Sequence, residues 1–141
     1  FYDDLGNPER QPHLVKPKRW EEDPGFVESP QCEYSTFAGR MSWQDQGQTL
    51  FGTPLRMRYE GLDKAALYKI RVTYVGRFRA TMRLVADGGY EVHPAMPQPS
   101  QIEPVEFDIP MEATQDGTLE LEWQLIEGRG CQVGEVWLIK K

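Results

Sequence analysis

Apolar and polar residues alternate with a period of two through most of the chain after residue 53. In the segment 54–60 the apolar positions are Leu55, Met57 and Tyr59, and arginines lie between them. This period belongs to a β-strand that buries one face and exposes the other to solvent. Because antiparallel sheets tolerate one solvated face and parallel sheets are buried on both, the pattern predicts antiparallel sheet.

Five further segments repeat this alternation, and turn signals such as Asp87-Gly88-Gly89 and Asp116-Gly117 separate them. The segments are 67–74, 80–86, 105–109, 118–125 and 133–139. Short strands with turns about every 8–12 residues are typical of two-sheet sandwiches and barrels. We therefore predict an all-β fold, an antiparallel two-sheet jelly-roll β-sandwich. The aromatic residues predicted for its core are Tyr59, Tyr68, Tyr74, Phe107 and Trp123.

The size and composition of the chain exclude several classes of protein. Its 141 residues suffice for one domain, and its 13 Gly and 11 Pro favour short elements joined by turns. No stretch approaches the roughly 20 apolar residues of a membrane-spanning helix, so no membrane span is expected. The formal net charge of −6 argues against a general nucleic-acid binder.

The first 52 residues differ in kind from the rest. Four prolines interrupt the segment between residues 12 and 30, too many for central strands. The segment also carries more large apolar residues than a free tail would. We therefore expect residues 1–30 to form an ordered, extended, Pro-rich strap packed on a β-sandwich domain of residues 31–141.

Charge is unevenly distributed along the chain. Residues 1–52 carry five Lys and Arg against nine Asp and Glu, a net of −4. Residues 53–86 carry eight against two, a net of +6, and residues 87–141 carry three against eleven, a net of −8. One interpretation is that basic and acidic strands lie side by side and neutralise each other. The alternative is a single basic sheet face that attracts anionic ligands. The residues of that face would be Arg56, Arg58, Lys69, Arg71 and Arg83.

None of the common catalytic signatures is present. The two histidines, His13 and His93, lie in no metalloprotease pattern. The chain also has no nucleophile elbow, Walker-type phosphate loop or dinucleotide-binding glycine motif. Carboxylates that a glycosidase pair would need, such as Glu106 and Glu120, lie on the solvent side of predicted strands, where a hydrated face explains them more simply. We therefore expect no catalysis by this chain.

Cys32 and Cys131 leave alternatives open. Because the first and last strands of sandwiches often lie close together, one prediction is a disulfide that closes a loop of about 100 residues. Two separate buried thiols are equally compatible with the sequence. A zinc site made of both cysteines with His13 and His93 matches no known ligand spacing and is disfavoured.

A similar strand-like sequence pattern occurs in segments 68–74, 82–88 and 117–123 and in the apolar last segment, 133–138. Segment 117–123 has the form Gly-x-Leu-x-Leu-x-Trp. Over residues 50–141 the chain resembles the galactose-binding-like β-sandwiches. These include malectin-like domains and many carbohydrate-binding modules of polysaccharide-degrading enzymes. The resemblance implies a non-catalytic accessory domain attached to a glycoside hydrolase or polysaccharide lyase.

The function that this resemblance implies is carbohydrate binding on behalf of a larger secreted enzyme. Its partners would be a polysaccharide or oligosaccharide and the catalytic domain of the same parent chain. Its location would be extracellular, periplasmic or at the cell surface. The opening Phe1-Tyr2-Asp3-Asp4 reads like the middle of a polypeptide, so we expect a fragment of a longer protein. The alternative is a structural interaction domain with no ligand of its own, which the N-terminal strap favours.

Modules of this kind bind sugar with aromatic side chains in loops, flanked by polar groups that hold the hydroxyls. The loop or edge aromatics are Trp20, Trp43, Phe51, Phe78 and Tyr90. A predicted Pro-rich loop over residues 88–104 carries Tyr90 and His93 and would form one wall of the site. Arg77 and Arg79 near Gly76 would reach it and favour an anionic glycan, since a guanidinium matches carboxylate and sulfate oxygens. The predicted binding residues are thus Trp20, Trp43, Arg77, Arg79, Tyr90 and His93.

No cofactor is required by the predicted fold, and calcium is the ion that it would most readily carry. The resemblance suggests a structural ion where the N- and C-terminal segments meet, which would recruit Glu33 or Glu135. The densest oxygen donors in loops are Tyr2-Asp3-Asp4 and Glu21-Glu22-Asp23. Structural calcium is therefore an expectation, although the chain has no EF-hand spacing.

Overall fold

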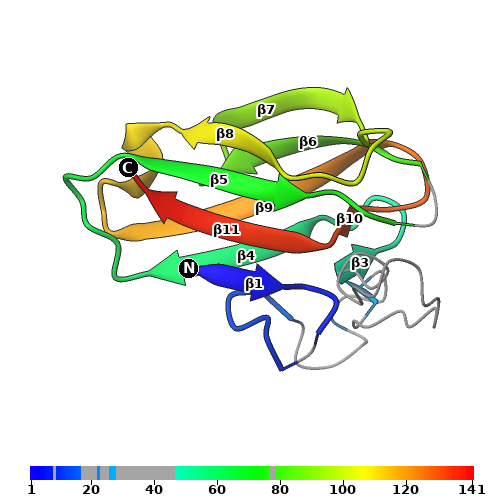
Figure 1. The fold of residues 1–141 in the computed structure, drawn as a ribbon, viewed down its shortest axis with the longest axis horizontal. Coiled ribbons are helices and arrows are strands. Elements are labelled where there is room, and N and C mark those ends of the chain that lie inside the picture. Colours follow the sequence, from blue (N-terminus) through cyan, green and yellow to red (C-terminus); the bar gives the residue numbers. More distant parts are fainter. Residues whose placement is uncertain (8, 17–21, 23–25, 28–46, 77–78) are drawn as a thin grey trace.

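Two four-stranded antiparallel sheets pack face to face and enclose one core (Figure 1). The computed structural model describes residues 1–7, 9–16, 22, 26–27, 47–76 and 79–141. The first sheet, called the β11 sheet, has the order β1 (Tyr2–Asp4), β11 (Glu135–Lys140), β5 (Tyr68–Thr73), β8 (Val105–Ile109). The second, called the β9 sheet, has the order β4 (Leu55–Glu60), β9 (Thr118–Glu127), β6 (Thr81–Ala86), β7 (Tyr90–Pro97). The predicted all-β sandwich is confirmed.

Smaller elements complete the described part of the fold. A short antiparallel sheet joins β10 (Gln132–Val133), β3 (Gly47–Thr49) and β2 (Phe26–Val27). A 3-10 helix, η4 (Met111–Thr114), follows β8. No helix among the described residues has the length and apolar character needed to cross a membrane.

The inner faces of the two sheets supply the core, and their sequences show why. Strand β4 alternates strictly between buried and exposed residues, with Leu55, Met57 and Tyr59 inside. Leu119, Leu121 and Trp123 of β9 are fully buried beside them. Burial of each large apolar side chain contributes about 1.5–3 kcal/mol relative to exposure. Strand β5 of the β11 sheet buries alternate residues from Tyr68 to Val72 in the same way, so the period-two prediction of the core holds in both sheets.

The prediction of a Pro-rich loop over residues 88–104 is wrong for much of that range, because Tyr90–Pro97 forms strand β7. Among the described strands it pairs with β6 alone, at the edge of the β9 sheet. Edge strands tolerate proline, because one side of the strand donates no ladder hydrogen bond. Register shifts on β6 around Leu84 accommodate the irregular partner.

Residues 1–7 and 9–16 close the open edge between the two sheets. Strand β1 pairs with β11 at the edge of the β11 sheet. After a turn, the chain pairs with the edge strand of the other sheet, where the Val15 amide donates to the Arg56 carbonyl at 3.0 Å. The Arg58 amide donates to the His13 carbonyl at 2.8 Å, and Leu14 bridges Met57. We call residues 1–7 and 9–16 the clasp. Most of residues 17–30 lies outside the described residues, so the strap over 1–30 stays a prediction.

The basic and acidic strands lie side by side, as the first interpretation of the charge pattern predicted. Arg56 on β4 binds Glu122 on β9 at 2.8 Å, and Lys69 on β5 binds Glu106 on β8 at 2.8 Å. The alternative of one basic face is wrong. Consecutive strands β4 and β5 belong to opposite sheets, so their arginines and lysines point to opposite sides of the sandwich.

Candidate functional site

Four connections gather at one end of the sandwich, which we call the loop end. Thr81 at the start of β6 is opposite Pro97 at the end of β7 and Glu127 at the end of β9. The Gln98 amide donates to the Ala80 carbonyl at 2.9 Å, which ties two of these connections together. The connections are β3–β4, β5–β6, β7–β8 and β9–β10, of which residues 77 and 78 lie outside the described part.

An open hollow of about 590 Å³ lies at this end, between the β5–β6 and β7–β8 connections. Its lining residues are Tyr74, Val75, Gly76, Arg79, Pro97, Gln98, Pro99, Ser100 and Ile102. Arg79 and Ser100 are exposed, and Gln98 is half-buried. The hollow thus offers a guanidinium, an amide and a hydroxyl beside the apolar side chain of Ile102, which is 44% exposed. Such a mixture suits a polyhydroxyl ligand with one apolar face.

A chain of buried hydrogen bonds passes through Tyr74, one of the residues that line the hollow. The Trp123 indole N–H donates to the Tyr74 hydroxyl at 2.8 Å, and that hydroxyl lies 2.6 Å from His93 Nε2. His93 Nδ1 lies 2.8 Å from the Pro94 carbonyl oxygen, which can only accept. Nδ1 therefore carries the ring proton, and Tyr74 donates to Nε2. Burial lowers the pKa of His93, against the opposing effects of the Pro94 carbonyl and Glu91. Burial likewise raises the pKa of the Tyr74 hydroxyl, so the chain is neutral.

The structure separates the predicted site residues. His93 is buried against Phe107 with both ring nitrogens engaged, so it forms no loop wall, and its placement there is wrong. Tyr90 is 41% exposed but follows the β6–β7 turn, at the end of the sandwich opposite Arg79. Trp20, Trp43 and Arg77 lie outside the described residues. Of the predicted residues that are described, Arg79 lies at the hollow.

Sequence reasoning missed Gln98, Ser100 and Ile102, which complete the lining. The run Gln98-Pro99-Ser100 directly follows the edge strand β7 and is a strong turn signal. Had β7 been recognised, this turn would have been placed at the same end as Arg79. The missing step was therefore the assignment of a strand that contains two prolines.

Phe51 is an exposed aromatic residue of the β3–β4 connection at the loop end. Its side chain is 75% exposed, and its backbone has a φ of 55°, which costs a residue with a side chain roughly 1–2 kcal/mol. The Phe51 amide donates to the Arg129 carbonyl at 2.7 Å, which fixes this conformation. Gly130 permits the close approach, because a Cβ there would meet the Thr49 carbonyl oxygen at 1.7 Å. A large aromatic held outward in a strained loop is a candidate for ligand contact.

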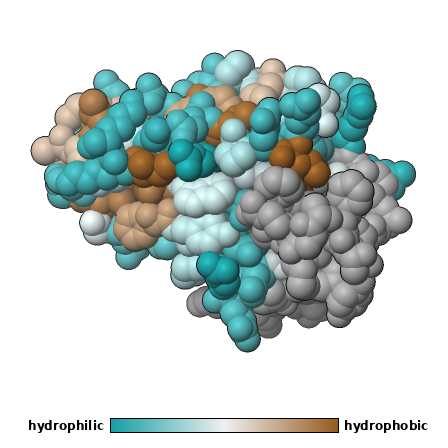
Figure 2. All heavy atoms as spheres, in the orientation of Figure 1, coloured by the Kyte–Doolittle hydropathy of each residue, from teal (hydrophilic) through white to brown (hydrophobic). Residues whose placement is uncertain are grey.

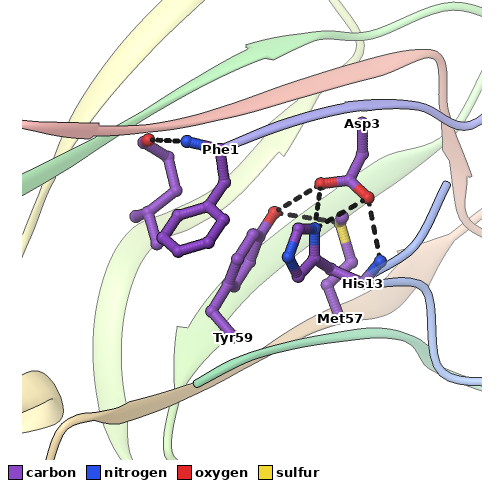
Figure 3. A network of polar contacts seen from close by, with 6 residues as sticks. Phe1, Asp3, His13, Met57 and Tyr59 are labelled. Carbon is purple, nitrogen blue, oxygen red and sulfur yellow. Dashed lines mark hydrogen bonds and ion pairs between the residues drawn. The ribbon is translucent and has the colours of Figure 1, made fainter. Parts of the chain in front are cut away.

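A second polar network lies within the clasp (Figure 3). The carboxylate of Asp3, which is fully buried, accepts hydrogen bonds from the His13 amide at 3.0 Å and from the Tyr59 hydroxyl at 3.3 Å. His13 Nδ1 lies 2.9 Å from Asp3 Oδ2, and its ring stacks on Tyr59 with centroids 4.5 Å apart. These contacts join β1, the clasp turn and β4, so their role is to hold the clasp.

The structure tests part of the metal and disulfide predictions. Cys131 is a free, buried thiol, and burial raises its pKa to about 11. Cys32 lies outside the described residues. Within the described ranges no group of three or more metal-ligating side chains exists, so His13, His93 and Cys131 do not form the zinc site considered above. Asp4 and Glu135 are buried neighbours on β1 and β11, where calcium was expected, but two carboxylates fall short of the six to eight oxygens that calcium takes. Calcium therefore stays a prediction.

Comparison with known proteins supports the fold. No protein-family model matches the sequence, and no curated protein matches it. Among solved structures, the chain is similar to a family 35 carbohydrate-binding module from an environmental isolate, with 17% sequence identity and a TM-score of 0.50. The match covers 82% of this chain and 86% of that one. The resemblance to the β-sandwich of carbohydrate-binding modules is thereby confirmed at the level of the fold.

Proposed function

We propose that this chain is a non-catalytic carbohydrate-binding module that holds a glycan at the loop end. The observation that carries the proposal is the hollow of about 590 Å³, lined by Arg79, Gln98 and Ser100, on a fold shared with a carbohydrate-binding module. We further propose that the module serves a larger secreted polysaccharide-degrading enzyme. The absence of a catalytic signature from the sequence agrees with an ancillary role.

The lining residues suggest how a sugar would be held. The Gln98 amide and the Ser100 hydroxyl can donate to and accept from sugar hydroxyls. Ile102 would cover an apolar sugar face, and the outward ring of Phe51 lies at the same end of the sandwich. Arg79 is the charged side chain among the lining residues, and its fork would pair with a carboxylate or sulfate group. The ligand class favoured is therefore a uronic-acid or sulfated glycan.

One observation favours the second candidate, a structural domain that packs against a neighbouring protein domain. Phe51 and Ile102 expose large apolar surfaces at the loop end, at 75% and 44%. Such surfaces also occur where a domain docks on another. In that case the isolated chain would bind no glycan.

Affinity gel electrophoresis against neutral, uronic-acid and sulfated polysaccharides tests the proposal. We expect retardation by an anionic polysaccharide, and we expect Arg79→Ala and Gln98→Ala to reduce it. Retardation should also weaken between low and physiological salt, because the Arg79 contact is screened.

A matched control is Arg58→Ala, which removes another exposed arginine from strand β4, outside the lining of the hollow. Its retardation should equal that of the unmodified chain. Failure of every polysaccharide to retard the protein would contradict carbohydrate binding and leave the docking domain. Retardation that Arg79→Ala and Arg58→Ala reduce equally would contradict the loop end as the site.

A further inference from the structure

Four side chains form a continuous row across the outer face of the β11 sheet. Tyr2 on β1 is opposite Trp137 on β11. Trp137 is opposite Arg71 on β5, and Arg71 is opposite Glu106 on β8. Residues opposite one another in neighbouring strands share a face, and this face is the outer one because the alternate residues of β11 are buried. With strands about 4.8 Å apart, the row spans about 14 Å. We call it the outer row.

The aromatic half of the outer row is flanked by two guanidinium groups. The rings of Tyr2 and Trp137 have centroids 5.1 Å apart and planes inclined by 36°. The Arg10 guanidinium lies 5.3 Å from the centre of the Tyr2 ring, and that of Arg71 lies 5.9 Å from the centre of the Trp137 ring. Both rings are half-buried, so part of each remains open to solvent.

Hydrogen bonds fix the geometry of the outer row before any ligand arrives. The Tyr2 hydroxyl donates to Glu135 Oε1 at 3.0 Å, and Glu135 also accepts from the Thr73 hydroxyl at 3.3 Å. At the other end, Arg71 Nε donates to Glu106 Oε1 at 2.7 Å. Side chains already held in one conformation lose little entropy on binding, so the row is preorganised.

Figure 2 looks onto this face of the molecule. Residues of intermediate hydropathy, drawn pale, gather over β11 and β1, with hydrophilic and hydrophobic residues around them. Glu106 accepts from both Lys69, at 2.8 Å, and Arg71, so both cations at this end of the row already have an anionic partner. The face therefore combines aromatic surface with paired polar groups.

We propose that the outer row is a second glycan-binding surface, separate from the loop end, and that it takes an uncharged stretch of oligosaccharide lying across the strands. Pyranose rings present an apolar face that packs on aromatic rings, and their hydroxyls can bond to Arg10, Arg71 and Glu106. An apolar protein surface would instead desolvate these charged groups without replacing their hydrogen bonds. At this end of the row a glycan carboxylate would have to compete with Glu106 for Lys69 and Arg71, so the row favours neutral sugars.

NMR titration of the isotope-labelled 141-residue protein tests this surface. The probes are cellohexaose, xylohexaose and mannohexaose, which are neutral and longer than the row. We expect the Trp137 indole N–H and the amides of Tyr2 and Arg71 to shift with at least one probe. The Trp123 indole N–H is fully buried and serves as an internal control that stays unchanged.

Variants separate ring stacking from a general loss of structure. Trp137→Leu keeps an apolar side chain but removes the flat ring, and we expect it to weaken binding about tenfold, as loss of one stacked aromatic would. Trp137→Phe and Tyr2→Phe keep a ring and should retain most of the affinity. Tyr90→Leu removes an exposed aromatic from another surface and should have no effect, which makes it the matched control.

The outcomes distinguish this inference from the proposed function. Shifts at the outer row that persist in Arg79→Ala support the second surface, whatever happens at the loop end. Shifts confined to Gln98, Ser100 and their neighbours would overturn the second surface and leave the proposed function standing. Equal loss of binding in Trp137→Leu and Trp137→Phe would overturn ring stacking. No shift at Trp137 with any probe would also overturn the second surface.

Discussion

His93 is hydrogen-bonded to Tyr74, and His13 stacks on Tyr59, yet the two polar networks differ in the charge of their central group. Around His93 the side chains that bond to one another are neutral and buried, and the chain of bonds ends on the carbonyl of Pro94. Around His13 the central group is the Asp3 carboxylate, and the imidazole side chain keeps 21% of its surface in solvent. The first network lies between the sheets, whereas the second joins the clasp to both of them.

The difference follows from the hydrogen-bonding groups that each region supplies to its buried polar atoms. A fully enclosed charge would be costly, so the core network uses only groups that satisfy one another as neutral donors and acceptors. At the clasp, the Asp3 carboxylate is also fully buried, and hydrogen bonds from the His13 amide and the Tyr59 hydroxyl, beside the partly exposed His13 ring, replace its contacts with water. We therefore expect damage to the core network to unfold the whole domain, and damage to the clasp network to loosen one edge.

The largest effect is expected from Trp123→Ala. The indole is fully buried between the sheets and donates to Tyr74, so its loss creates a cavity and removes a donor. Such truncations cost about 3–5 kcal/mol in the free energy of unfolding. Urea denaturation followed by circular dichroism measures this loss.

Trp123→Phe is the control for that experiment, since it keeps much of the volume and removes the indole N–H. It should cost clearly less than Trp123→Ala. An equal cost for both substitutions would show that the hydrogen bond to Tyr74, rather than packing, dominates the contribution of Trp123.

A smaller and more local effect is expected from Asp3→Ala. The substitution leaves the His13 amide and the Tyr59 hydroxyl without their acceptor, at roughly 1–3 kcal/mol for each buried group that water does not reach. Hydrogen exchange at the Val15 and Arg58 amides should accelerate more than exchange in β9. Uniform acceleration throughout the chain would contradict the clasp as a separately opening edge. Asp3→Asn keeps an acceptor oxygen, so exchange at these amides should be faster than in the unmodified protein and slower than in Asp3→Ala.

The sequence predicts local features of this fold, but not those that depend on which strands become neighbours. Alternation in segments such as 54–60 and 118–125 identifies which residues face inward, because that depends on local pleating alone. It does not identify the sheet to which a strand belongs, since both sheets share the period of two. The expectation that Arg58 and Lys69 share a face failed for this reason. Nor does alternation predict burial by distant residues: Thr73 is a polar residue of the segment 67–74, yet it is fully buried and bonded to Glu135, a residue 62 positions away.

The candidate site is harder to predict than the core for a related reason. Its lining comes from two connections whose proximity depends on the topology, not on any local pattern. Arg79 was found because it is a basic residue next to a glycine turn. Gln98 and Ser100 were missed because Pro94 and Pro97 made an edge strand look like a loop.

A still smaller effect is expected from pH, through His93. Burial lowers its folded-state pKa below the ordinary 6.5, so the unfolded chain binds the proton more readily. The contribution of His93 to the free energy of unfolding should therefore be constant above about pH 6.5 and fall as the pH decreases from there towards the folded pKa. Urea midpoints at pH 7.5 and 5.5 measure this change. His93→Gln should reduce the difference between the two midpoints. An undiminished difference in His93→Gln would assign the pH dependence to other groups.

The smallest effect is expected at the surface, where Arg56 on β4 binds Glu122 on β9. Burial raises the pKa of Glu122, but hydrogen bonds from Gln124 and Arg56 outweigh it and lower the pKa overall. Because 46% of the Arg56 side chain remains in water, Glu122→Gln should change the free energy of unfolding by less than about 1 kcal/mol. High salt should remove most of that difference, since exposed pairs are screened. A loss in the free energy of unfolding as large as that of Asp3→Ala, and unaffected by salt, would contradict this expectation. The Arg56–Glu122 pair would then stabilise the fold as much as the buried carboxylate of the clasp does.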